Sequence, residues 1–521
     1  MRIEMKDFYV PDLRELLDNS AEKFGDKIFI KYFDGNTVIE KSYEKVREDS
    51  LAVCRWLIHN SVCNKHIAIA GRTTYNFIIY FFGILLSGNV AVPFDPQISS
   101  KDAIKLFDSA DIDIILHEDE FTAEAQEIMT ALPRIYKAIN FSDDVEFARI
   151  IDKYTDNPKY AALSDFRVDK NKCALIIYTS GTTGKRKGVM LSTYSLIANI
   201  MYTDYCEALD NGRVALSVLP MHHIYSFSGD CIRNLQDGVT VCINKDLRDL
   251  SSNLKRFEPN VMRVVPMMAQ SLLNRIKVLT SKKNNPLTPE QAKEKVFGRN
   301  ITWLISGGAY LNPEIVEGYD ELGIYLRQGY GMTEAGCRIS VPDETVSVES
   351  VGRVIDICDV RTQKGEIQVK TPSVMLGYYK MPEETKKMFT VDGWLRTGDL
   401  GYVTEDRQLF ITGRLKNLII LSGGENVSPE AIEKKFAPIH EVEEVQIYAE
   451  NDRIVAEVFP NKEYCSINGI SDIEGIIKEK IKMMNSTAKA SHIIAELRVR
   501  DVPFEKTPSG KLIRKETVVS K

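Results

Sequence analysis

The chain lacks the features that mark several large classes of protein. Its nine cysteines contain no CxxC pair, so we expect neither a zinc site nor a disulfide framework, and a reducing, cytoplasmic location fits their scatter. The longest apolar run, residues 77–86, is far shorter than the roughly 20 residues that a bilayer span needs. The first seven residues contain no apolar signal segment. We therefore expect neither a membrane-spanning nor an exported disulfide-rich protein.

The chain also lacks an excess of positive charge. Its net charge is −6, so no global attraction to nucleic acid is expected. Basic residues are concentrated near one end, because residues 475–521 carry eleven Lys or Arg against five Asp or Glu. This stretch is either a solvated face or a surface that meets phosphates or an acidic partner.

Composition and length otherwise indicate a globular protein with several subdomains. Apolar residues make up 44% of the chain and charged residues 27%, which is typical of soluble proteins. Because domains average about 150 residues, a chain of 521 residues is expected to form two to four of them.

Apolar runs alternate with helical patterns through the first three quarters of the chain. The predicted strands are residues 66–70, 113–116, 173–178, 214–219, 261–265 and 301–305, and the predicted helices are residues 74–86, 192–207 and 267–278. This alternation predicts an α/β protein with mostly parallel sheets covered by helices. From about residue 351, shorter strands at residues 366–370 and 408–411 predict a small antiparallel sheet or barrel.

The last hundred residues have a different pattern. Predicted helices at residues 429–436 and 471–484 flank predicted strands at residues 441–448 and 453–459. We therefore expect a large N-terminal domain of residues 1–415 and a small α+β C-terminal domain of residues 416–521.

Residues 178–190 form the most informative segment of the chain. They follow an apolar strand, and Ser192 can cap a helix after them. Between strand and helix lie two glycines, a run of hydroxyl side chains and a cluster of cations. Glycines let a backbone approach an anion, while hydroxyls and amides donate hydrogen bonds to its oxygens. The segment predicts a phosphate-binding loop.

This loop does not follow the P-loop pattern GxxxxGK[ST]. Gly181 and Gly184 are too close together, and Arg186 follows Lys185. The alternative is an ordinary strand-to-helix turn, since Gly, Ser and Thr favour turns.

Four further segments contain residue types suited to nucleotide chemistry. Residues 306–310 place two glycines directly after a strand, where a flat base can lie against backbone. Residues 328–334 combine the aromatic ring of Tyr330 with a hydroxyl and with Glu334, a carboxylate that could hold Mg²⁺. Asp399 could accept both hydroxyls of a ribose, although Asp is also common in turns. Residues 506–511 place a lysine on a loop bounded by Pro and Gly.

The order and spacing of these segments resemble the adenylate-forming superfamily, which includes acyl-CoA synthetases, adenylation domains and firefly-type luciferases. The resemblance runs from residue 82 to Lys511, and its most specific parts are residues 178–190, 330–334, 397–401 and 413–429. It implies that an acid attacks the α-phosphate of ATP, forms an acyl-adenylate and passes the acyl group to a thiol. Within this superfamily, the motifs of the chain are most similar to those of the AMP-forming acyl-CoA synthetases.

The resemblance also implies a role for each matching residue. The residues that would cradle the β- and γ-phosphates are Thr179, Ser180, Gly181, Thr182, Thr183, Gly184 and Lys185, with Lys187 at the end of the loop. Those that would line the nucleotide site are Gly307, Gly308, Ala309, Gln328, Gly329, Tyr330 and Gly331. Thr333 would contact the α-phosphate, Glu334 would bind Mg²⁺, and Asp399 with Arg414 would hold the ribose.

Four implied roles concern the reaction and the movement of the chain. Lys511 would bridge the α-phosphate and the substrate carboxylate. His223, favoured over its neighbour His222, would lie beside the acyl carboxylate and the thioester tunnel. Lys416 would be the hinge about which a mobile C-terminal lid rotates. Residues 422–424 would let a pantetheine arm pass.

Three positions depart from the usual pattern of the superfamily. Arg186 replaces a proline in the first loop, and Tyr310 stands where Pro or an apolar residue is common. The approach to Thr507 is one residue longer, which bears on the placement of Lys511.

These features lead to one main hypothesis and two alternatives. The first is a cytoplasmic ligase that joins a fatty or aromatic acid to coenzyme A, using ATP and Mg²⁺. The second is an adenylation enzyme that loads a phosphopantetheine carrier protein, and the basic stretch of residues 475–521 could contact such a carrier. A free α-amino acid substrate is disfavoured, because Ile224 and Tyr225 follow the histidines where an acidic residue would be expected. The third is a nucleotide-binding scaffold without catalysis, against which the joint presence of Glu334, Asp399, Arg414 and Lys511 argues.

Overall fold

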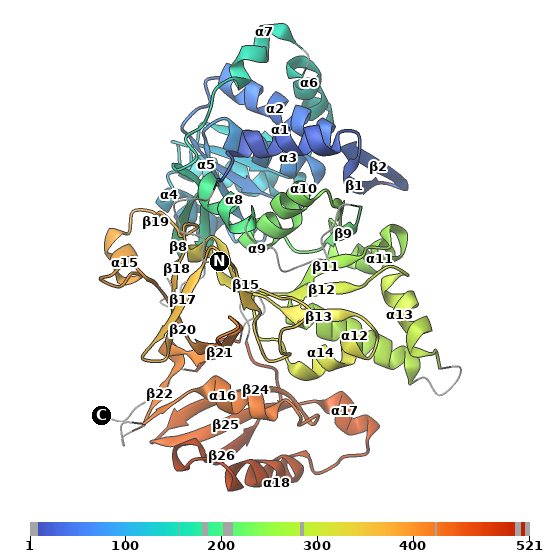
Figure 1. The fold of residues 1–521 in the computed structure, drawn as a ribbon, viewed down its shortest axis with the longest axis vertical. Coiled ribbons are helices and arrows are strands. Elements are labelled where there is room, and N and C mark those ends of the chain that lie inside the picture. The colour runs from blue at the N-terminus through green and yellow to red at the C-terminus, as the bar shows by residue number, and fades with distance from the viewer. Residues whose placement is uncertain are drawn as a thin grey trace.

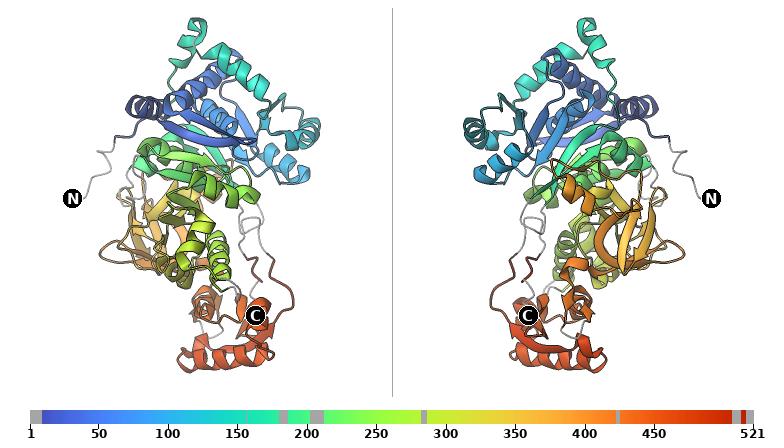
Figure 2. Two further views of the ribbon diagram at one scale, coloured as in Figure 1. Left: turned by 90° about the vertical axis from the view of Figure 1, so that its right-hand side faces the viewer. Right: turned by 90° about the vertical axis from the view of Figure 1, so that its left-hand side faces the viewer.

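The structure is a computed structural model that describes residues 9–155, 157–179, 186–201, 212–281, 286–421, 425–505 and 512–515. Figures 1 and 2 show the chain as a stack, with the N-terminal elements at one end and the C-terminal elements at the other. In sequence order the elements follow the predicted change from alternating helices and strands to short antiparallel strands.

The first large sheet has the strand order β19-β8-β7-β4-β3-β5-β6. Its strands are β3 (His66–Ala70), β4 (Val90–Phe94), β5 (Ile114–His117), β6 (Lys137–Asn140), β7 (Cys173–Thr179), β8 (Lys187–Ser192) and β19 (Gly377–Tyr378). Strands β3 to β7 are parallel, whereas β8 pairs antiparallel with both β7 and β19. The helices of this region are α1 (Leu13–Phe24), α2 (Tyr43–His59), α3 (Tyr75–Leu86), α4 (Ser100–Ser109), α5 (Thr122–Ala131), α6 (Asp144–Tyr154), α7 (Pro158–Ala161) and α8 (Thr193–Met201).

The second large sheet has the order β13-β12-β11-β9-β10-β1-β2. Its strands are β1 (Ile28–Asp34), β2 (Thr37–Ser42), β9 (Val214–Ser217), β10 (Thr240–Ile243), β11 (Val261–Val264), β12 (Trp303–Ser306) and β13 (Tyr325–Gln328). All neighbours are parallel except β1 and β2. The helices of this region are α9 (Ile224–Ser226), a π-helix (Phe227–Arg233), α10 (Asn234–Asp237), α11 (Leu250–Phe257), α12 (Pro266–Thr280), α13 (Pro289–Phe297) and α14 (Pro313–Asp320).

Two small antiparallel sheets follow, as the shorter strands predicted. One joins β14 (Tyr330–Met332), β15 (Cys337–Val341) and β16 (Arg353–Val354), and the other joins β17 (Asp359–Gln363), β18 (Glu366–Lys370), β20 (Leu395–Val403) and β21 (Leu409–Arg414). The short helix α15 (Pro382–Lys387) lies between β19 and β20 in sequence. The mixed α/β class with parallel sheets and small antiparallel sheets is therefore confirmed.

The last part of the described chain packs around a hydrophobic cluster of its own, which runs from Ile419 to Ile494. It contains β22 (Ile419–Ile420), β23 (Asn426–Val427), α16 (Pro429–Glu433), β24 (Val442–Glu450), β25 (Arg453–Pro460), α17 (Lys462–Ile467), α18 (Ile473–Ser486) and β26 (Ile494–Val499). These elements form the orange-to-red layer of Figure 1. The boundary at residues 415 and 416 stays a prediction. Among the described residues, no helix combines the length and apolarity that a membrane crossing requires.

The prediction that a loop leads directly into a helix after residue 186 was wrong. The chain does not pass from the loop directly into a helix, because β8 pairs with β7 from Thr179↔Lys187 to Cys173↔Ser192. Val189 and Leu191 are buried on this strand. Apolar residues at alternate positions are typical of a strand, and this pattern was not used in the prediction. The helix begins only at Thr193, where the Ser192 hydroxyl accepts the Ser195 backbone N–H at 3.0 Å, so the predicted cap is confirmed.

We predict that Gly83→Ala destabilises the N-terminal layer. Alanine normally stabilises a helix interior by up to about 1 kcal/mol relative to glycine. Here the added Cβ would lie 2.4 Å from Val53 Cγ1 on the neighbouring helix α2, and such overpacking typically costs about 1–3 kcal/mol. The free energy of unfolding in urea should therefore fall. The double variant Gly83→Ala/Val53→Ala should recover most of it, and a single variant as stable as wild type would contradict the packing argument.

Candidate active site

A cavity of about 160 Å³ lies where the second parallel sheet meets the hairpin β14–β15. Residues after β12 and β13 form one part of its lining, including Gly307, Gly308, Gly329, Tyr330 and Gly331. Gly308 has φ +81°, and a Cβ added there would meet no atom within 4 Å. This part of the lining therefore presents backbone rather than side chains, which fits a flat ring.

Gly307 is required because Tyr225 occupies the space beside it. A Cβ on Gly307 would lie 2.9 Å from Tyr225 Cζ, and the Tyr225 hydroxyl donates to the Ile305 carbonyl at 2.8 Å. Burial raises the pKa of this hydroxyl. Tyr225 thus joins the short helix α9 to β12 beneath the cavity.

Gln328 positions the loop that follows β12. Its Nε2 donates to the Ala309 carbonyl at 2.7 Å, and its Oε1 accepts the Leu311 backbone N–H at 3.2 Å. Parallel pairing sets Gln328 opposite Ser306, at the carboxyl end of β12. Its side chain therefore holds the predicted base-binding backbone in place, and it is absent from the cavity lining itself.

Three residues predicted to bind the nucleotide meet at one carboxylate. Tyr330 Oη donates to Asp399 Oδ2 at 2.6 Å, and Arg414 Nε lies 2.9 Å from Asp399 Oδ1. Antiparallel pairing of β20 with β21 sets Asp399 directly opposite Arg414. Burial and the neighbouring Asp399 raise the pKa of Tyr330, so its hydroxyl stays a donor. Each carboxylate oxygen retains acceptor capacity for a further hydroxyl.

Glu334 and Lys187 are joined through a residue that the sequence did not single out. Tyr378 Oη donates to Glu334 Oε1 at 2.8 Å, and Lys187 Nζ lies 4.8 Å from the centroid of the Tyr378 ring. Lys187 Nζ also lies 2.8 Å from Glu384 Oε2 on α15, and its hydrogen bond lowers the pKa of Glu384 to about 2. Pairing of β19 with β8 brings Tyr378 here from far along the chain, so no local pattern could have revealed it.

The two adjacent histidines have different surroundings. His222 is buried, its Nδ1 has no hydrogen-bond partner, and burial lowers its pKa to about 3. His223 is exposed at the start of α9, and its ring centroid lies 4.4 Å from that of His222. Neither belongs to the lining of the cavity, and the role of His223 stays a prediction.

Several predicted site residues lie outside the described part of the chain. They are Ser180, Gly181, Thr182, Thr183, Gly184, Lys185, residues 422–424 and Lys511. The residues that flank Lys511 are placed, because the Ile513 N–H donates to the Glu505 carbonyl at 2.9 Å and Arg514 binds Glu433 through both guanidinium nitrogens. Lys416 is exposed in a 3₁₀ turn (Leu415–Asn417) between β21 and β22, and its hinge role stays a prediction.

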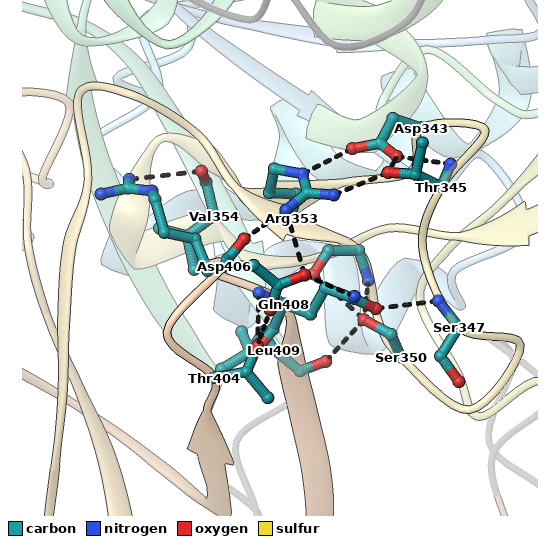
Figure 3. A network of polar contacts seen from close by, with 12 residues as sticks. Asp343, Thr345, Ser347, Ser350, Arg353, Val354, Thr404, Asp406, Gln408 and Leu409 are labelled. Atoms are coloured by element: carbon teal, nitrogen blue, oxygen red, sulfur yellow. Dashed lines mark hydrogen bonds and ion pairs between the residues drawn. The ribbon is translucent and has the colours of Figure 1, made fainter. Parts of the chain in front are cut away.

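A polar network holds the loop between β15 and β16 against the turn between β20 and β21 (Figure 3). Arg353 Nε donates to Asp343 Oδ2 at 2.7 Å, and its Nη2 donates to Thr345 Oγ1 at 2.7 Å. Gln408 Oε1 accepts the Ser347 backbone N–H at 2.8 Å. Asp343 directly follows Val341 and Pro342, which line the cavity. The network therefore fixes the end of the strand that forms one cavity wall.

Comparison with known proteins places the chain in a family. The sequence profile of the AMP-binding enzymes matches residues 17–379, well over half of the chain. The chain therefore belongs to the AMP-binding enzymes of the adenylate-forming superfamily, which confirms the resemblance carried by the motifs, and its named relatives indicate an acid–thiol ligase.

Individual relatives are distant. 4-Coumarate-CoA ligase 1 of Narcissus pseudonarcissus is 27% identical over 550 residues, covering 99% of this chain and 95% of that protein. Peroxisomal OPC-8:0-CoA ligase 1 of Arabidopsis thaliana is 29% identical over 376 residues, covering 68% and 65%. The crystal structure of the anthranilate CoA ligase AuaEII in complex with anthranoyl-AMP has a TM-score of 0.81, 16% identity, and coverage of 98% and 97%, so it shares the fold.

We predict that Arg353→Met destabilises the protein in a pH-dependent way. Burial opposes ionisation of Asp343, but hydrogen bonds from Arg353 and Thr345 outweigh it and lower the pKa of this carboxyl. A lowered folded-state pKa stabilises the protein above the unfolded value of about 3.9, and this stabilisation disappears as the pH falls through the folded value. Loss of the partner should cost about 1–3 kcal/mol at pH 7. The cost should shrink below about pH 4.

The control for this prediction is Arg248→Met. Arg248 pairs with Asp246, but 85% of its side chain is exposed, so solvent screens the pair and its loss should change stability very little. Urea unfolding of both variants at several pH values tests the difference. A cost of Arg353→Met that is the same at every pH would show that the charge of Asp343 does not contribute.

Proposed function

We propose that this protein uses ATP to convert a carboxylic acid to an acyl-adenylate and then transfers the acyl group to the thiol of coenzyme A. The observation that supports this best is the junction of Tyr330, Asp399 and Arg414 beside a cavity lined by glycine backbone. A carboxylate with free acceptor capacity suits the two ribose hydroxyls, and the backbone lining suits adenine. The rest of the cavity leaves room for the acyl group.

The first step needs charge stabilisation rather than a base. A carboxylic acid is already ionised at neutral pH, so its oxygen attacks the α-phosphorus directly. The bond from that phosphorus to the oxygen that bridges to the β-phosphate breaks, and pyrophosphate leaves. Preorganised donors and cations stabilise the extra negative charge at phosphorus. We assign this role to Thr333, which lines the cavity, and to Lys511.

In the second step the thiol sulfur attacks the acyl carbon. The bond between that carbon and the AMP oxygen breaks, AMP leaves, and the thiol proton passes to solvent. We propose that the C-terminal domain, residues 416–521, turns about Lys416 between the two steps and excludes the water that would hydrolyse the adenylate.

Glu334 is suited to hold Mg²⁺ beside the phosphates. Its carboxylate is buried, and Tyr378 occupies Oε1 and so fixes its orientation. Mg²⁺ commonly takes one or two protein carboxylates and keeps several waters. The ion would supply positive charge to the triphosphate when bound.

The proposal also names the thiol that accepts the acyl group and the cellular location of the protein. Two relatives that cover 86% and 99% of the chain are named coenzyme A ligases, and one that covers 98% of it is named an acyl-carrier-protein ligase. The former favour coenzyme A as the thiol, and a carrier protein is the alternative. The fatty or aromatic acid expected from the motifs stays a prediction, and so does the cytoplasmic location expected from the cysteines. Pyrophosphate release with a panel of acids, alone and then with coenzyme A, tests the proposal. No release with any acid would overturn it.

We predict that Lys511→Ala lowers the rate of acid-dependent pyrophosphate release by at least about 100-fold, the loss typical of one charge-stabilising group. Lys515→Ala is the matched control, because Lys515 Nζ pairs with Glu457 at 2.6 Å and is not assigned to the site. It should retain most of the wild-type rate. Undiminished release by Lys511→Ala would show that another residue supplies the positive charge.

A further inference from the structure

Three arginines line the cavity on the side of the π-helix and β15: Arg233, Arg263 and Arg338. Arginine is effectively always protonated at neutral pH, so each brings one positive charge into the wall of the cavity. Buried charges are normally paired. An arginine of this cavity that has no carboxylate partner within the protein would therefore indicate a negatively charged ligand.

Arg263 is balanced within the protein. Its Nη1 lies 2.8 Å from Asp230 Oδ1, and both side chains are at most 3% exposed. Ser217 and Ser226 donate to the other oxygen of Asp230 at 3.2 and 3.1 Å. Gly229 leaves space for this arginine, because a Cβ there would lie 2.5 Å from Arg263 Nε.

Arg233 is balanced as well. It forms an ion pair with Asp237 one helical turn away, and its Nη1 donates to the Ile200 carbonyl at 2.8 Å. Its charge is therefore neutralised locally on the helix. The two arginine–aspartate pairs together leave no net charge in the wall.

Arg338 is different. It is only 9% exposed, and its Nη1 is buried without a hydrogen-bond partner. No carboxylate in the described ranges of the chain forms an ion pair with it. Its backbone is fixed, because Asn199 Nδ2 donates to the Arg338 carbonyl at 2.8 Å and Asn199 Oδ1 accepts its N–H at 3.0 Å. Burial lowers the pKa of Arg338 to about 10, so it remains charged at neutral pH.

An unbalanced buried guanidinium is costly in the free protein and becomes favourable when a ligand supplies the opposite charge. Its planar fork matches a carboxylate, which can accept two hydrogen bonds from it. The size of the cavity restricts the ligand further. The glycine backbone proposed for the nucleotide and Arg338 line the same cavity of about 160 Å³. The acid shares this volume with the nucleotide, so only a compact acid fits.

We propose that the acid substrate is a compact dicarboxylate, whose first carboxyl is adenylated while its second is bound by Arg338. The proposal rests on the function proposed above and specifies its substrate class. The second carboxyl takes part in no bond change and only fixes the substrate. Apolar neighbours in the lining, such as Ile224, Ile305 and Val341, would contact the carbon skeleton between the two carboxyls.

Matched pairs of acids test this assignment. We would compare succinate with butyrate, glutarate with pentanoate and phthalate with benzoate, measuring kcat/KM for pyrophosphate release and then for coenzyme A thioester formation. In wild type, the dicarboxylate of at least one pair should exceed its partner by about 100-fold or more, because a site built for a polar group rejects an analogue that lacks it. Arg338→Met should abolish that preference, because kcat/KM for the dicarboxylate should fall far more than kcat/KM for its monocarboxylate partner. Arg338→Lys should retain part of the preference.

A second readout does not depend on activity. If Arg338 is uncompensated in the free protein, Arg338→Met should leave the thermal midpoint of unfolding unchanged or raise it. The preferred dicarboxylate alone should raise the midpoint of wild type and not that of the variant. Arg361→Met serves as the control, because Arg361 lies on β17 and pairs with the mostly exposed Asp392. It should keep the wild-type preference among acids.

The outcomes separate the two proposals. Pyrophosphate release that is best with monocarboxylates, with a ranking unchanged in Arg338→Met, overturns the dicarboxylate assignment and leaves the proposed function intact. An equal loss with every acid also overturns it, since Arg338 would then bind the reacting carboxyl. A large drop in the thermal midpoint of Arg338→Met would show that the arginine is paired within the protein. No release with any acid overturns the proposed function itself.

Discussion

The candidate site depends on one buried carboxylate, that of Asp399. It is 5% exposed, and a charge so far from water is tolerated only when it is paired and hydrogen-bonded. Tyr330 from β14 and Arg414 from β21 satisfy it. Three strands of the two small sheets are thereby held in one arrangement, and the glycine-lined wall around Tyr330 takes its position from them. The same interaction lies directly before the turn that leads to the C-terminal elements.

The arginines that line this cavity differ in whether a carboxylate of the protein pairs with them. Asp230 with Arg263 and Asp237 with Arg233 are closed pairs, and they fix the π-helix that forms one wall. A π-helix is rare and is frequently found at functional sites. Arg338 faces the same space without a described partner. In the proposal made above, neighbouring arginines therefore have different roles: Arg263 and Arg233, which are paired with carboxylates, stabilise the fold, and Arg338, which has no such partner, binds the substrate.

Much of the fold and part of the site could be predicted because they are local. Strands β3 and β18 have the predicted bounds, and α3 and α12 differ from them by one or two residues, since apolar periodicity and capping residues lie within each segment. The antiparallel strand β8 was not predicted, because the glycines, hydroxyls and cations before Ser192 also fit a loop that leads into a capped helix. The nucleotide role of Gln328 stays a prediction, and only the structure shows that its amide holds the loop at Ala309. Tyr378 and Glu384 were not found, since only the β8–β19 pairing brings them to Glu334 and Lys187.

The sequence by itself determined the class of fold, the order of the nucleotide-binding segments and the family. These follow from residue types at short spacings, where local conformational preference and a shared motif act within a few positions. Only the tertiary structure decided which side chains neutralise one another. Charges balance in three dimensions, and Arg338, Arg263 and Asp230 are brought together from a hairpin, a strand and a helix far apart in the chain. Whether an arginine is satisfied or open to a substrate is therefore a property of the packed interior, because burial sets the cost of leaving its charge unpaired.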